Sequence, residues 1–336
     1  MIQTSAPGKI ILFGEHAVVY DKLGIAGALD RRIFVSVRKG KNGLNFIQKS
    51  EYPSFTRNRN QLESLIDKFR IFYKENRFDL IKQMSFEDAI CVVITEVFEK
   101  YGYEDLDIEL TINESLKNIG QSSSIFSSLA LGITKFLKKD LNKKEISDIA
   151  YLGDVVAHGG TPSGIDNSVV TYGGYITYRK SEGPKPLDID FRFPLIIVSS
   201  GEPSRTNVTV PSIRKQREEN PNFVNPILER LNEISVSGLE YLKTRNLEKM
   251  GKSMTNYYEE LRKLNISTKK LDKIIEMALK NKALGAKPTG GWGGGSVIVL
   301  AENEKDAKSL IELFNKGGFD AFETKLGVEG VKIEDI

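Results

Sequence analysis

Residues 5–16 read SAPGKIILFGEH, and this stretch carries the strongest structural signal in the chain. Its apolar run, Ile10–Phe13, predicts a short buried strand. A proline, a glycine and a lysine precede the run, and Gly14, Glu15 and His16 follow it. Glycine lets a backbone turn sharply or approach a ligand closely. We therefore expect this strand to be bordered by residues with a functional role.

Two other glycine- or serine-rich segments lie far along the chain. Residues 120–124, GQSSS, precede a predicted helix that runs to about residue 137. Residues 289–296, TGGWGGGS, lead into a predicted strand at 296–301. The first of these is a candidate anion cradle, because backbone N–H groups at a helix N-terminus are free and the helix dipole adds positive charge. Three serines are also an ordinary helix cap, so the segment alone leaves both interpretations open.

A fourth segment supplies carboxylates. Residues 158–167 read HGGTPSGIDN and predict a rigid turn between a helix and a strand, with Asp166 at the entrance of the strand. Asp154 precedes His158 by four residues, so the two share one face of the predicted helix 143–157. Asp166 as a turn-capping residue and Asp154 as a solvated helix residue are the structural alternatives to a functional role.

Familiar phosphate and metal motifs are not present. Residues 251–253, GKS, resemble the end of a Walker A loop, but Asn246 stands where its first glycine should be. No G-x-G-x-x-G stretch follows a strand. With two histidines and one cysteine, a zinc site or a Cys-His hydrolase has few residues from which to be built.

The composition excludes several classes of protein. The 336 residues are 40% hydrophobic and 28% charged, which excludes a disordered or fibrous chain. The net charge of +3 offers no basic excess for nucleic acid or a membrane surface. No segment approaches the ~18 apolar residues of a membrane span, and the N-terminus does not resemble a signal peptide. The lone Cys91 cannot form an internal disulfide, so we expect a reduced, cytoplasmic protein.

Hydrophobic periodicity predicts mixed α+β structure in two lobes. The clearest helix is at 85–101, with Ser85 as its cap and Gly102 at its end. Strands are expected at 33–37, 106–112 and 194–198, helices between about 210 and 284 and at 304–316, and two short strands after that. Residues 38–59 are predicted to be a polar loop, residues 169–178 two strands around a Gly-Gly turn, and residues 181–186 a linker.

Together these segments resemble the GHMP kinase superfamily and, within it, the mevalonate kinase family. Residues 5–19, SAPGKIILFGEHAVV, match the opening motif of that family almost residue for residue. Residues 162–167, PSGIDN, followed by TYGG at 171–174, resemble its P-S-G-x-D-N…T-x-G-G segment, and AKPTGG at 286–291 resembles its C-terminal glycine loop. The order and spacing of the motifs agree over essentially the whole chain.

The resemblance implies a fold and a reaction. The fold would be a two-lobed GHMP kinase, with an N-terminal lobe like ribosomal protein S5 domain 2 at residues 1–183 and a ferredoxin-like lobe at 187–336. The reaction would be transfer of the γ-phosphate of ATP to the 5-hydroxyl of mevalonate, a step of isoprenoid biosynthesis. The implied partners are mevalonate and ATP, with Mg²⁺ as the cofactor and neither nucleic acid nor a membrane. The oligomeric state stays open, a homodimer included.

The resemblance also implies roles for individual residues. Asp166 would accept the proton of the substrate hydroxyl, and Lys9 would stabilise the developing oxyanion. The remaining roles fall into three groups: substrate binding by Glu15, His16, Thr206 and Gly291; ATP binding by Gly120, Gln121, Ser122, Ser123 and Ser124; and Mg²⁺ binding by Asp154 with Ser124, or Ser123 beside it.

The phosphate loop departs from the family pattern P-x-x-x-G-L-G-S-S-A-A. Residues 116–126 read LKNIGQSSSIF, so the proline and the second glycine are missing and Phe126 replaces a small residue. Ser122 reaches positive φ less freely than glycine, so we expect an altered loop shape. Trp292 interrupts the third segment, either as an aromatic packed beneath the loop or as a wall of the substrate site.

Three functions remain open on the sequence. The first is phosphorylation of mevalonate, which the residues His16 to Val19 favour. The second is another GHMP kinase activity, on phosphomevalonate or homoserine. The third is a non-catalytic relative that binds nucleotide, which the altered phosphate loop suggests and the presence of Lys9, Asp154 and Asp166 opposes.

Overall fold

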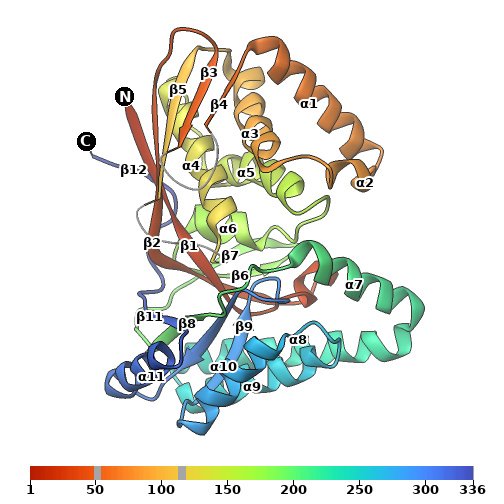
Figure 1. The fold of residues 1–336 in the computed structure, drawn as a ribbon, viewed down its shortest axis with the longest axis vertical. Helices are drawn as coiled ribbons and strands as arrows, with labels where there is room; N and C mark the ends of the chain where they lie inside the picture. Colours follow the sequence, from red (N-terminus) through yellow and green to blue (C-terminus); the bar gives the residue numbers. More distant parts are fainter. Residues whose placement is uncertain (49–53, 113–118, 336) are drawn as a thin grey trace.

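The computed structural model describes residues 1–48, 54–112 and 119–335, and these form two lobes (Figure 1). Each lobe has a β-sheet with helices packed on it. The mixed α+β, two-lobed architecture expected from the sequence is confirmed. Within the described ranges, no helix is both long and apolar enough to cross a membrane.

An eight-stranded sheet forms the first lobe. Its strands are β1 (Ile2–Phe13), β2 (Gly24–Lys39), β3 (Leu44–Gln48), β4 (Phe55–Arg57), β5 (Leu106–Ile112), β6 (Tyr175–Arg179), β7 (Gly183–Leu187) and β12 (Lys332–Ile333). The main order is β12-β1-β2-β5-β3-β4. The strand β6 pairs with the first residues of β2, on the same edge as β5, and β7 pairs with β6. The pair β3-β5 is parallel and the other pairs are antiparallel.

Six α-helices and one short 3₁₀ turn accompany this sheet. They are η1 (Ala17–Tyr20), α1 (Arg59–Lys74), α2 (Phe78–Ile81), α3 (Phe86–Tyr101), α4 (Gln121–Phe136), α5 (Lys143–Ala157) and α6 (Ile165–Tyr172). The predicted helix at 85–101 is confirmed. Ser85 caps its N-terminus by accepting from the N–H of Asp88, and Gly102 follows its last residue.

The second lobe contains a four-stranded antiparallel sheet in the order β11-β8-β10-β9. Its strands are β8 (Leu195–Ser199), β9 (Gly285–Thr289), β10 (Ser296–Leu300) and β11 (Asp320–Glu323). Its helices are α7 (Thr206–Glu219), α8 (Pro221–Lys243), α9 (Leu247–Arg262), α10 (Lys269–Lys280) and α11 (Glu304–Lys316). Numbered along the chain, the strand order is 4-1-3-2 with helices before the second strand and after the third, which is the expected ferredoxin-like arrangement.

The C-terminal segment leaves the second lobe after β11. The strand β12 pairs with the start of β1, with Thr4 opposite Ile333. The backbone of Gly173 also bridges to Glu329. The end of the chain therefore lies on the first sheet, beside the N-terminus (Figure 1).

The prediction of two strands at 169–178 was wrong for its first half. Residues Ile165–Tyr172 form helix α6, and only residues Tyr175–Arg179 form a strand. The β-branched residues of this stretch favour a strand locally. In the structure, however, Ile165, Val169 and Val170 lie on one side of a helix and pack on Ile11 and its neighbours in the first sheet. Tertiary packing therefore overrides the local preference.

Two other predictions need correction. Residues 183–187 are not a linker, because they form β7 and pair antiparallel with β6. The polar stretch 38–59 is not all loop: β2 extends to Lys39, and both β3 and β4 lie within the stretch. The two strands have only five and three residues, and polar residues interrupt the apolar ones. Their hydrophobic signal is therefore weak. Residues 49–53 lie outside the described part of the chain.

Candidate active site

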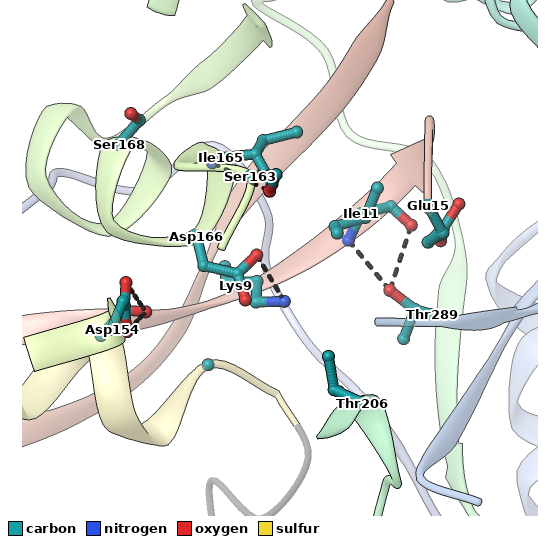
Figure 2. Close-up of polar contacts among 12 residues, drawn as sticks. Lys9, Ile11, Glu15, Asp154, Ser163, Ile165, Asp166, Ser168, Thr206 and Thr289 are labelled. Atoms are coloured by element: carbon teal, nitrogen blue, oxygen red, sulfur yellow. Dashed lines mark hydrogen bonds and ion pairs between the residues drawn. The ribbon is translucent and has the colours of Figure 1, made fainter. Parts of the chain in front are cut away.

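The side chains of Lys9 and Asp166 meet in an ion pair (Figure 2). The ammonium of Lys9 lies 2.9 Å from Oδ1 of Asp166, and the two side chains are 5% and 27% exposed. Lys9 follows a shift in the β1-β2 register between Pro7 and Gly8, and such bulges re-aim the next side chain. Asp166 is the second residue of α6, so the prediction that it stands at the entrance of a strand was wrong. The partial positive charge of a helix N-terminus favours its carboxylate there.

The N-terminus of α4 lies directly beside Lys9. The N–H of Lys9 donates to the carbonyl of Ile119 at 2.8 Å. Gly120 has a φ of 97°, and a Cβ there would lie 2.7 Å from Cγ of Lys9. Only glycine allows both the left-handed backbone and the close approach. Gln121 and Ser122 begin the helix, and Ser122 does not have a positive φ. The predicted departures at Leu116, Lys117 and Asn118 lie outside the described residues.

Ser123 lies beside Asp154, and Ser124 does not. The hydroxyl of Ser123 donates to the Asp154 carboxylate, 2.9 Å from Oδ1 and 2.8 Å from Oδ2. The hydroxyl of Ser124 lies within 2.6 Å of the carbonyl of Pro7 and 2.8 Å of that of Gly120. Consecutive helical residues point about 100° apart. Of the two serines expected beside the metal, it is therefore Ser123 that faces the carboxylate, and this geometry favours Ser123 over Ser124.

The carboxylate of Asp154 is almost completely buried, with 1% exposed. Burial raises its pKa well above the usual range, and the negative charge of Asp166 raises it further. The hydroxyl of Ser123 and the charge of Lys9 oppose this shift. A buried carboxylate next to a second carboxylate is a place where a bound cation would be favoured.

Glu15 and His16 lie in the loop after β1 and line a cleft that Asp154 and Asp166 also line. Glu15 forms an ion pair with Lys287 of β9, and both side chains are fully buried. Burial raises the pKa of Glu15 and lowers that of Lys287, while each charge opposes the shift of the other. One carboxylate oxygen, Oε2 of Glu15, has no hydrogen-bond partner among the described residues. Burial also lowers the pKa of His16 to about 4, so this imidazole is neutral at pH 7.

The third glycine-rich segment packs against the start of α7. A Cβ on Gly291 would lie 1.8 Å from Oγ1 of Thr206, so only glycine fits. The hydroxyl of Thr209 donates to the carbonyl of Gly291 at 2.6 Å. Trp292 is fully buried and stacks on Tyr258 with ring centroids 6.0 Å apart. It is therefore the aromatic packed beneath the loop, and not a wall of the substrate site.

Two clefts meet at Asp166. The smaller has about 920 Å³ of free space, its open mouth included, and is lined by Glu15, His16 and Asp166 among others. The larger has about 1880 Å³ of free space on the same measure and is lined by Lys9, by the first turn of α4 at residues 120–123, and again by Asp166. Thr206, Gly290 and Gly291 also border both clefts. One carboxylate thus faces two adjoining compartments of different size.

Some residues of the site were not predicted from the sequence. Lys287 stands inside the quoted motif AKPTGG, where a lysine in an otherwise small and apolar strand was the available signal. Thr289 accepts from the N–H of Ile11 at 2.9 Å and so joins β9 to β1 (Figure 2). Arg214 also lines the smaller cleft, and its spacing of eight residues from Thr206 along a helix was the signal for it.

Comparison with known proteins identifies the family. The family model described as GHMP kinases C terminal matches residues 239–318. The mevalonate kinase of Methanocaldococcus jannaschii is 30% identical over 339 residues, which cover 95% of this chain and 98% of the relative. The mevalonate kinase of Pyrococcus furiosus is 29% identical over 345 residues, with 99% and 98% coverage.

The fold agrees with these sequence relationships. A solved crystal structure of a mevalonate kinase superposes with a TM-score of 0.79 at 26% identity, and covers 98% of this chain and 100% of its own. The opening motif, the arrangement of both sheets and the pair Lys9–Asp166 occur in one chain that matches its relatives from end to end. The chain therefore belongs to the mevalonate kinase family of the GHMP kinases.

Proposed function

We propose that this protein transfers the γ-phosphate of ATP to the 5-hydroxyl of mevalonate. The observation that carries the proposal is the pair of Lys9 and Asp166 at the boundary of the two clefts. The smaller cleft suits a small hydroxy acid, and the larger suits a nucleotide. A hydroxyl held between them would face Asp166 on one side and the phosphate on the other. Full-length similarity to mevalonate kinases supports the choice of substrate.

In this proposal, Asp166 accepts the proton of the substrate hydroxyl as the oxygen attacks phosphorus. Lys9 holds the carboxylate in place and stabilises negative charge on the oxygen. Phosphoryl transfer depends mainly on positioning and charge stabilisation, so a carboxylate and a lysine are sufficient side chains. The first turn of α4, with Gly120, Gln121 and Ser122, would bind phosphate oxygens through its backbone.

The residues present fit a magnesium ion. Asp154 and Ser123 offer the hard oxygen ligands that Mg²⁺ prefers, and a bound cation would favour the charged form of Asp154 and so oppose the rise in its pKa. Within the described residues, no group of three or more His, Cys, Asp or Glu side chains forms a complete cage. We therefore propose that protein oxygens supply part of the coordination and phosphates and water the rest. When bound, the ion would neutralise charge on the phosphates.

Three further expectations remain proposals. We propose the lobe division at 1–183 and 187–336, with the terminal strand β12 returning to the first sheet. A cytoplasmic location is supported by the single, buried Cys91, which forms no disulfide. A homodimer stays a prediction that sedimentation of the purified protein would test.

The test is ADP release from Mg-ATP with mevalonate, phosphomevalonate, homoserine and galactose as acceptors. We expect turnover of mevalonate alone, and a loss of about 10³- to 10⁴-fold in kcat for Asp166→Asn, because a general base contributes up to that amount. Asp148→Asn, an exposed carboxylate of α5 outside both clefts, is the matched control and should retain full activity. Turnover of a different acceptor, or ATP binding with no turnover at all, would contradict the proposal.

A further inference from the structure

Helix α7 carries a stripe of three side chains along the smaller cleft. Thr206, Val210 and Arg214 are spaced four residues apart, so they lie on one face of the helix, and all three line the cleft. Thr206 contributes a hydroxyl beside Gly291, Val210 an apolar side chain and Arg214 a cation. The backbone rises about 12 Å over these eight residues, and helical side chains lean toward the N-terminus. The cation therefore reaches into the cleft from the end away from Thr206.

Arg214 is the better placed of two cations at this cleft. Its guanidinium is half-buried, and Nη2 donates to the hydroxyl of Thr161, 2.8 Å away in the loop before α6. No ion pair joins it to a carboxylate of the described residues. Lys82, the other lysine or arginine that lines the cleft, is exposed and is held by no such contact. Arg214 thus keeps most of its five donors available, in a fixed position.

Lysines neutralise two of the three carboxylates that line the cleft. Glu15 is paired with Lys287 and Asp166 with Lys9, and the third carboxylate is that of the buried Asp154. An anionic group on a bound molecule would be attracted by Arg214, which no carboxylate of the described residues neutralises. Between the two ends, Val18, Val19, Val210 and Pro211 provide an apolar surface for a hydrocarbon chain with a methyl branch.

We propose that Arg214 binds the carboxylate of the substrate and so selects a hydroxy acid whose carboxylate lies at the end opposite the reacting hydroxyl. This inference rests on the proposed function, because it assigns an orientation to mevalonate: the 5-hydroxyl lies at Asp166 and the carboxylate at Arg214. The planar guanidinium matches a carboxylate with two parallel hydrogen bonds, while Thr161 holds it in place.

The experiment compares mevalonate with 3-methylpentane-1,3,5-triol, a neutral analogue in which a hydroxymethyl group replaces the carboxylate. For Arg214→Gln we expect the KM for mevalonate to rise about 30- to 100-fold, since hydrogen bonds to charged groups contribute that much. Its kcat at saturation and its KM for ATP should change less than about 3-fold, because Arg214 lies away from the reacting atoms. The KM for the triol should also stay within about 3-fold of wild type. Arg214→Lys should recover part of the loss, because it keeps the charge but not the bidentate geometry.

Two control variants make the outcome specific. Arg217→Gln changes an arginine one turn further along α7 that lines neither cleft, and it should leave both KM values unchanged. Lys82→Gln changes the other cation and should alter the KM for mevalonate only slightly. Three results would overturn the inference. In Arg214→Gln, the KM could rise equally for mevalonate and the triol, or the KM for mevalonate could stay unchanged. Alternatively, only Lys82→Gln could show a large rise in the KM for mevalonate. Failure of the wild-type protein to phosphorylate mevalonate would instead overturn the proposed function, and the role of Arg214 with it.

Discussion

At the scale of single residues, the two neighbouring serines of α4 have different surroundings. Ser123 contacts the buried carboxylate of Asp154, whereas Ser124 is buried against the carbonyls of Pro7 and Gly120. Ser123 lines the larger cleft and Asp154 the smaller, so the first contact lies between the two clefts. The second ties the N-terminus of α4 to the bulge in β1 that precedes Lys9. Ser123 is thus placed to contact a ligand, whereas Ser124 stabilises the backbone that positions the site.

This difference predicts distinct consequences of removing each hydroxyl. Ser123→Ala should raise the Mg²⁺ concentration for half-maximal activity by about 10-fold or more, as loss of a metal-site contact does. Ser124→Ala should lower the free energy of unfolding by about 1–3 kcal/mol, because buried carbonyls lose their donor. Magnesium titrations of activity and urea unfolding of both variants measure the two effects. A raised Mg²⁺ requirement in Ser124→Ala, at unchanged stability, would show that the two roles are reversed.

At the scale of elements, the site depends on close packing among α3, α4 and α5. Gly153 precedes Asp154 in α5, and a Cβ there would lie 2.6 Å from Cγ of Phe126 and 2.7 Å from Cγ2 of Val93. Phe126, which replaces a small residue of the family loop, is fully buried at this contact. The absence of a side chain at 153 thus makes room for the larger residue at 126 and lets α5 bring Asp154 to α4.

We therefore expect Gly153→Ala to destabilise the protein by about 1–3 kcal/mol, the usual effect of overpacking a core. Helix propensity alone predicts the opposite, a gain of up to about 1 kcal/mol. Urea unfolding distinguishes the two directions. Asp148→Ala, at an exposed position of the same helix, should change stability by less than about 0.5 kcal/mol. A stabilised Gly153→Ala protein would mean that α4 and α5 can separate without loss.

At the scale of the whole molecule, the lobes are joined by polar contacts that pass beside the site. Lys287 of β9 pairs with Glu15 and also donates to the carbonyl of Pro288 at 2.8 Å. Tyr257 of α9 donates to the carbonyl of Glu15 at 2.9 Å. Thr289 bonds to the backbone of Ile11. The second lobe therefore fixes the loop that carries Glu15 and His16, and the geometry of the smaller cleft depends on both lobes.

A buried pair and an exposed pair of the same chemistry should differ in energy. Lys287→Met leaves Glu15 buried without its partner and should cost about 3–5 kcal/mol of stability. The double variant Lys287→Met, Glu15→Gln should cost less than the sum of the two single variants, because no uncompensated charge remains. Lys22→Met breaks a more exposed lysine–glutamate contact between the lobes, with Glu229 of α8, and should cost less than about 1 kcal/mol. Equal losses from Lys287→Met and Lys22→Met in urea unfolding would contradict the difference in burial.

Local sequence was sufficient for much of the fold and for the identity of the chemical groups. The apolar periodicity of 85–101, with its cap at Ser85, predicted α3, because a helix of this kind is specified by its own residues. The motifs at 5–16 and 162–167 named Lys9 and Asp166, and the structure brings the two side chains together. Such motifs are informative because glycine and a catalytic side chain must occur at fixed spacing.

The features that local sequence did not predict depend on contacts between residues far apart in the chain. Residues 165–172 have the composition of a strand, and their helix forms because it packs on the first sheet. The choice between Ser123 and Ser124 required the direction of α4 relative to β1 and α5. The pair Glu15–Lys287 and the position of Arg214 on the cleft join residues of different lobes. Sequence specifies which groups the chain carries, but their burial and their partners follow from packing that no local pattern encodes.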